Sequence, residues 1–145
     1  MVNGVKTFED LNCWKISTDL RRMCSQIVKD FPQDEKYKLA DQIVRALRSV
    51  TANIAEGFGR YHYQEYVQLC RQSHGSLFEL IDHFIVARDE GYISEDQLNQ
   101  VRNQITNSLA VSNGFINYLL KAKVTNNLAS DAEVHYGTSH DYENH

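Results

Sequence analysis

Apolar residues recur at three- and four-residue spacing over four long stretches of the 145-residue chain. This spacing places apolar side chains on one face of an α-helix and is typical of helices that pack together. The predicted helices cover about residues 8–31, 34–56, 63–90 and 95–123. Links of two to six residues favour antiparallel neighbours. The pattern therefore predicts an all-α, antiparallel up-down-up-down four-helix bundle.

Residues that favour caps and turns coincide with the predicted helix ends. These are Thr7, Pro32, Gly91 and the capping-box pair Ser94 and Gln97. Gly57 and Gly59 are predicted to stop the second helix, because glycine accepts the left-handed conformation that often closes helices. A single proline in the whole chain leaves long helices uninterrupted.

The helical pattern stops near residue 124, which divides the chain into a bundle over 1–124 and a tail over 125–145. Residues 124–145 contain four Asp/Glu and no Lys/Arg, whereas the Lys/Arg and Asp/Glu of residues 1–123 balance. The tail is predicted to be flexible and acidic. Its three histidines have no fixed frame and predict no metal site: His135, His140 and His145.

The composition is that of a globular protein, with 42% apolar and 23% charged residues. No apolar run approaches the roughly eighteen residues of a membrane span, and the first residues lack the apolar stretch of a signal peptide. A cytoplasmic location is expected. Cys13, Cys24 and Cys70 lack metal-site spacing and are expected to be reduced, buried thiols.

A line of polar residues follows the second predicted helix within an arc of about 80°. Its members are Gln42, Arg45, Ser49, Asn53 and Glu56. The third helix offers Ser76 and Glu79 beside Gly75, and small residues there would let Arg45 or Asn53 reach Glu79 across the gap. A structural network that fixes the helix register is the favoured interpretation, and a binding or catalytic site is the alternative.

The apolar arc of the same helix is broader than its own bundle requires. Tyr37, Val44 and Ala55 extend it past the core-facing side. The extra width predicts a second neighbour for this helix, such as another subunit.

Motifs of common enzymes are missing from the sequence. There is no Glu-x-x-His repeat of the kind that builds di-iron sites in helix bundles, no G-x-S-x-G turn and no P-loop. We predict no catalytic, cofactor-binding or metal-binding residue and no small-molecule substrate. A metal or hydrolytic enzyme using Glu56 and Glu79 is kept as a minor hypothesis.

Basic and aromatic residues near the end of the second helix are candidates for contact with nucleic acid or a partner. They are Arg45, Arg48, Arg60, Tyr61 and Tyr63. Aromatic rings can stack on bases while arginines contact phosphate. The alternative is that the arginines are solvated and the tyrosines cover the end of the core.

The order of these motifs resembles a known family. It runs Phe8, Leu11, Trp14, Phe31-Pro32, Glu35, Leu39, Gln42, Arg45-Ala46, Ser49-Val50, Asn53-Ile54-Ala55-Glu56-Gly57, Gly59-Arg60, Gly75-Ser76-Leu77-x-Glu79 and Gly91-Tyr92. Over about residues 8–123 this is similar to the bacterial 23S rRNA-intervening sequence proteins. That resemblance implies antiparallel four-helix bundles assembled as ring-like homopentamers, without established biochemical activity.

The same resemblance carries expectations for individual residues and partners. It implies that the family's characteristic polar positions are Arg45, Asn53, Glu56, Arg60 and Glu79. The fold is shared with the accessory protein of diversity-generating retroelements, which binds reverse transcriptase and nucleic acid. The main hypothesis is a non-enzymatic homo-oligomeric scaffold. The alternative is a nucleic-acid-binding accessory factor that contacts RNA or a reverse transcriptase.

Overall fold

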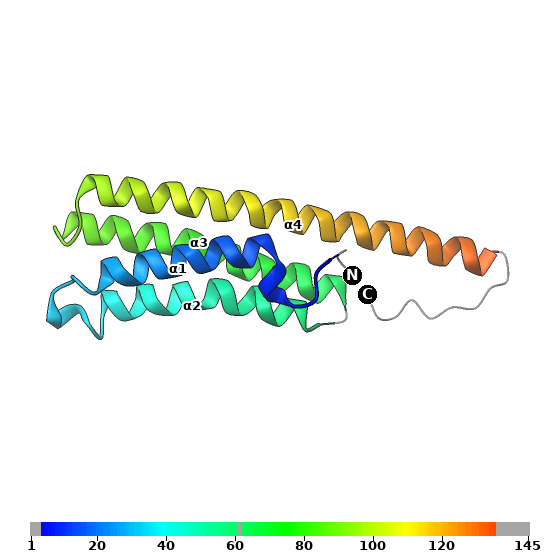
Figure 1. Cartoon of the computed structure of the whole chain (residues 1–145), viewed down its shortest axis with the longest axis horizontal. Coiled ribbons are helices and arrows are strands. Elements are labelled where there is room, and N and C mark those ends of the chain that lie inside the picture. The colour runs from blue at the N-terminus through cyan, green and yellow to red at the C-terminus, as the bar shows by residue number, and fades with distance from the viewer. Residues whose placement is uncertain (1–3, 61, 136–145) are drawn as a thin grey trace.

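Four α-helices lie side by side with alternating directions in the computed structural model (Figure 1). The structure describes residues 4–60 and 62–135, with the course of the helix alone over 123–135. Within these residues the helices are α1 (Asn12–Val28), α2 (Leu39–Phe58), α3 (Tyr63–Asp89) and α4 (Glu95–His135). A single-turn 3₁₀ helix precedes each of the first two, η1 (Phe8–Asp10) before α1 and η2 (Gln33–Glu35) before α2. The predicted all-α four-helix bundle is confirmed.

Each helix packs against its neighbours in the chain, and α4 returns to pack against α1, which closes the bundle. Apolar side chains from all four helices fill the centre. The largest that are fully buried include Leu20, Ile43, Leu47, Tyr66, Leu77, Phe84, Leu98 and Leu119. Burying one such side chain stabilises the fold by about 1.5–3 kcal/mol relative to leaving it exposed. This core is the main source of cohesion.

The first predicted helix, 8–31, is wrong in its continuity. Thr7 and Asp10 form a capping box around η1, and Leu11 then adopts an extended conformation before α1 begins. Because Leu11 is buried, the break directs its side chain into the core. The capping box satisfies free amides at the start of η1, and α1 then begins after Leu11 without a side-chain cap.

The start of α2 also differs from the predicted 34–56, because residues after Pro32 form η2 and a turn. The Glu35 carboxylate accepts a hydrogen bond from the Leu39 amide at 3.1 Å. It also accepts one from the Tyr92 hydroxyl at 3.0 Å. Glu35 therefore caps α2 and ties its first turn to the loop between α3 and α4.

The second helix ends at Gly59 as predicted, but the predicted stop at Gly57 and the left-handed conformation of both glycines are wrong. Gly57 is a buried residue within α2, and Gly59 has a right-handed φ of −78°. A Cβ on Gly57 would lie 2.6 Å from Cδ1 of Tyr66, so the glycine is required by close approach of α3. A left-handed glycine does follow α3, where Gly91 has a φ of 78°.

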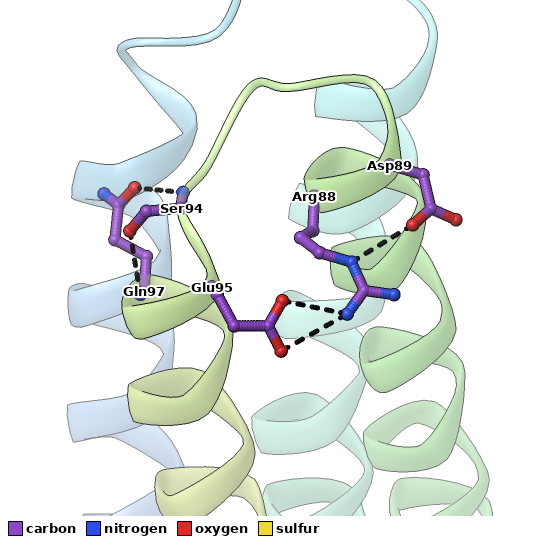
Figure 2. A network of polar contacts seen from close by, with 5 residues as sticks. All are labelled: Arg88, Asp89, Ser94, Glu95 and Gln97. Atoms are coloured by element: carbon purple, nitrogen blue, oxygen red, sulfur yellow. Dashed lines mark hydrogen bonds and ion pairs between the residues drawn. The ribbon is translucent and has the colours of Figure 1, made fainter.

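The turn from α3 into α4 carries the predicted capping box (Figure 2). The Gln97 backbone N–H donates to Ser94 Oγ at 3.1 Å, and the Ser94 backbone N–H donates to Gln97 Oε1 at 2.9 Å. Across the turn, the Arg88 guanidinium donates to the Glu95 carboxylate at 3.0 Å. These contacts fix the angle at which α4 leaves α3.

The fourth helix continues to His135, past the predicted end at 123. In Figure 1 its last turns extend beyond the ends of the other three helices. No proline or glycine occurs between residues 115 and 135, so nothing in the sequence forces the helix to stop. The expectation of an irregular segment from 125 is therefore wrong over 125–135. The predicted tail over 136–145, with His140 and His145, lies outside the described residues.

Candidate functional site

The polar line of α2 meets α3 in a hydrogen-bonded strip that we call the polar seam. Its members are Gln42, Arg45, Ser49, Asn53, Glu56, Ser76 and Glu79. Ser76 Oγ donates to Ser49 Oγ at 2.9 Å and joins the two helices. The Asn53 amide donates to Ser49 O at 2.9 Å and to Ser49 Oγ at 3.0 Å. The centre of the seam is thus closed by bonds within the chain.

Each charged member of the polar seam pairs with a residue four positions away in the chain. These pairs are Arg45 with Asp41 at 2.9 Å, Glu56 with Arg60 at 2.7 Å, and Glu79 with His83 at 3.0 Å. The expected contact of Arg45 or Asn53 with Glu79 is therefore wrong. Partners one helical turn away are closer than partners across the seam. Gln42 is exposed and belongs to none of these pairs.

The five predicted basic and aromatic contact residues do not form one platform. Tyr63 is buried, with 8% of its surface exposed, and Tyr61 lies outside the described residues. Arg60 pairs with Glu56 and approaches Glu65 at 4.0 Å, and both carboxylates raise the pKa of its guanidinium. Arg48 is exposed and belongs to a different surface.

That surface is a groove along the outer side of α1 and α2, which we call the α1/α2 groove. It has a volume of about 1050 Å³. Apolar side chains make much of its lining, among them Phe8, Trp14, Phe31, Tyr37, Val44 and Ala55. Tyr37 is 83% exposed, although exposing an aromatic side chain to water is unfavourable. The groove is an apolar surface that the described chain leaves open.

The sequence indicated one wall of this groove. Tyr37, Val44 and Ala55, which broaden the apolar arc of the second helix, all line it. The wall from α1 and η1 was missed, including Trp14 and Phe8, whose rings pack edge to face with centroids 5.3 Å apart. This wall was missed because the sequence pattern predicted one continuous helix from residue 8.

The three cysteines are buried free thiols, as expected. Burial raises the pKa of Cys13 to about 11 and those of Cys24 and Cys70 to about 12. These thiols remain protonated near neutral pH, and a protonated thiol is a poor nucleophile.

The described residues also bear on two other kinds of site, a metal centre and a membrane-spanning helix. Among them, no group of three or more histidine, cysteine or acidic side chains is arranged to hold a metal ion. None of the helices in the described part is both long and apolar enough to cross a membrane.

The sequence of this bundle matches that of a known protein family. The family model described as 23S rRNA-intervening sequence protein matches residues 9–114. The chain belongs to this family. The matched stretch includes all of α1, α2, α3 and the polar seam, and the family resemblance read from the motifs is confirmed. Among curated proteins, none matches the chain in sequence.

The family match also separates two parts of α4. It ends at residue 114, inside the helix, while α4 continues to His135. The last turns of α4 and the residues after them therefore lie beyond the matched core.

Proposed function

We propose that the protein is a non-enzymatic scaffold that assembles with copies of itself, as a homopentamer by its resemblance to the family. The observation that carries this proposal is the open α1/α2 groove. Large contiguous apolar patches are rare on the surfaces of monomeric proteins, and they often mark a site of association. The groove lies on the helix face whose breadth already suggested a second neighbour.

Energetics support association at this surface. Trp14, Tyr37 and Val44 line the groove, and covering apolar area contributes roughly 25 cal/mol per Å². Aromatic residues at such surfaces often dominate binding because they bury large areas with few rotatable bonds. A partner that covers the groove removes these side chains from water.

The enzyme hypothesis has less support than the scaffold. Glu56 and Glu79 are 52% and 56% exposed, and each is paired with a side chain four residues further along the chain. Their surroundings are those of ordinary surface ion pairs. The polar seam is better explained as a device that fixes α2 against α3.

The nucleic-acid alternative rests mainly on Arg48. Arg45 and Arg60 are in ion pairs, and the buried ring of Tyr63 is not available to stack on a base. Binding of RNA should fall steeply as salt increases if arginine and phosphate carry it. Fluorescence anisotropy with labelled RNA at low salt tests this, and tight, salt-sensitive binding would favour the accessory-factor hypothesis.

Size-exclusion chromatography coupled to light scattering tests the scaffold proposal. The expected mass is about five times the 16.7 kDa of one chain at micromolar concentration. A mass of one chain across that range would contradict self-association. Another multiple would retain self-association and overturn the pentamer.

A further inference from the structure

The α1/α2 groove is positively charged at its rim as well as apolar in its lining. Four cations line it: Arg21, Lys29, Lys36 and Arg48. The acidic residue in the lining is Asp41, and its carboxylate already pairs with Arg45. Among the described residues, neither Lys29 nor Arg48 makes an ion pair. The surface therefore favours an occupant with acidic and apolar side chains together.

The C-terminal segment of the chain has that composition. Residues 124–145 carry no Lys or Arg and four acids: Asp131, Glu133, Asp141 and Glu143. Apolar and aromatic residues are interspersed with them: Val124, Leu128, Val134, Tyr136 and Tyr142. The charge of this segment is opposite to that of the groove rim.

The length of the segment matches the groove. Along α2 the groove extends from Ala40 to Ala55, which is about 23 Å at 1.5 Å per residue. A helix over 124–145 would be about 33 Å long, and a more extended chain would be longer. The segment is long enough to cover the groove from end to end.

The direction of α4 decides which copy the segment reaches. Ala122 is still packed against the core, but α4 runs on to His135, about 20 Å further along the helix. Its last turns pass the ends of the other three helices (Figure 1). The course of α4 therefore carries residues 124–135 past the end of the bundle and away from the groove of the same chain.

We propose that residues 124–145 of one copy dock in the α1/α2 groove of a second copy. This inference rests on the proposed self-association and names the segment that fills its open surface. A contact between two different surfaces leads from one copy to the next and forms a ring when the rotation closes. The segment lies outside residues 9–114, which match the family model.

Isotope-coded cross-linking of the full-length protein tests the contact. Equal amounts of ¹⁴N- and ¹⁵N-labelled protein are mixed, allowed to exchange subunits, and treated with a carbodiimide that joins lysine amines to carboxylates at contact distance. We expect mixed-isotope peptides that join Lys29 or Lys36 to an acid of residues 124–145. Native mass spectrometry verifies that subunits have exchanged before the reagent is added.

A charge reversal within the groove sharpens the test. Arg48→Glu should lower the yield of these cross-links about threefold or more, because it places a carboxylate beside an acidic segment. Arg22→Glu is the matched control, since Arg22 is an exposed arginine of α1 outside the groove lining, and its yield should equal wild type. Equal losses in both variants would overturn the proposed site.

Light scattering on the same samples separates the two proposals. An oligomer without mixed-isotope cross-links would overturn docking of the segment and leave self-association in place. Cross-links confined to single-isotope pairs would also overturn it, because the segment would then contact its own chain. A monomer without cross-links would contradict both proposals.

Discussion

The two sides of α2 are similar in length but differ in whether other parts of the chain cover them. On the side facing α3, Ser49, Asn53 and Ser76 satisfy one another's hydrogen bonds within the chain. On the side facing α1, Tyr37 and Val44 border an open groove. The polar side, which has the appearance of a binding site, is internally satisfied. The apolar side, which resembles core, is the one left available for a partner.

The difference also appears in how closely the helices approach. Near the end of the polar seam, Gly57 admits the ring of Tyr66, and Ser73 Oγ donates to the backbone oxygen of Val50 at 2.9 Å. Between α1 and α2, the Arg21 guanidinium bridges to Thr51 Oγ1 at 2.6 Å along the groove. Small side chains close one side of α2, and a long side chain spans the other.

Charging the groove should produce the largest effect. Val44→Glu places a carboxylate in the apolar lining and should reduce the mass in light scattering from the oligomer to one chain, because burying an unpaired charge is costly. Circular dichroism should show unchanged helix content. Val86→Glu, at a 38% exposed valine of α3 outside the groove lining, is the control and should retain the oligomer. Dissociation by both variants would remove the distinction between the two surfaces.

Adding a side-chain atom where α3 packs closely against α2 should destabilise the fold without changing the assembly. Gly57→Ala forces the buried Tyr66 ring to move, because the new Cβ would lie 2.6 Å from Cδ1. We expect a loss of about 1–3 kcal/mol in the free energy of unfolding, measured with urea.

Gly75→Ala is the matched control for this loss. Gly75 lies in α3, and a Cβ there would meet no atom within 4 Å. Alanine is favoured over glycine in a helix by roughly 0.5–1 kcal/mol, so this variant should be more stable than wild type. Equal destabilisation at both glycines would show that close packing at Gly57 is not the cause.

Removing the centre of the polar seam should have a smaller effect. Ser49→Ala deletes the acceptor shared by Ser76 and Asn53 and should lower the unfolding free energy by about 0.5–1.5 kcal/mol. The mass in light scattering should not change. A dissociated oligomer would identify the seam as an interface and reverse the comparison.

The exposed ion pair on the seam side should contribute least. Arg45→Ala breaks the pair with Asp41, in which the arginine side chain is 79% exposed. We expect a change of roughly 0–0.5 kcal/mol in unfolding free energy, and a difference that shrinks as salt is added. A loss of unfolding free energy above about 1 kcal/mol that does not depend on salt would contradict this expectation. It would show that Arg45 stabilises the fold more than an exposed ion pair does.

Helical periodicity was enough to predict the fold, because four apolar faces of this length have few ways to pack. It was not enough to find the break at Leu11 or the late start of α2 at Leu39. Those ends depend on contacts made in the folded chain, such as the Glu35 carboxylate with Leu39 and Tyr92. The left-handed assignment of Gly57 failed for the same reason, since its neighbour Tyr66 comes from another helix.

The candidate surfaces were predicted with similar limits. The sequence placed Ser49 and Ser76 on facing helices, and the structure joins them directly. It did not reveal that Arg45 turns toward Asp41, because helical spacing allows several partners for a long side chain. The groove was visible from the sequence only through α2, since its other wall requires the packing of Trp14 and Phe8.

Thiol labelling on the two sides of α2 tests the central claim most directly. Ala52→Cys lies in the α1/α2 groove and Gln42→Cys on the polar seam, and both positions are exposed in the single chain. The buried native thiols, with their raised pKa values, should react slowly with maleimide. In the assembled protein we predict that position 52 reacts at least about tenfold more slowly than position 42, because a partner covers the groove. Equal rates, or protection of position 42 alone, would contradict the account.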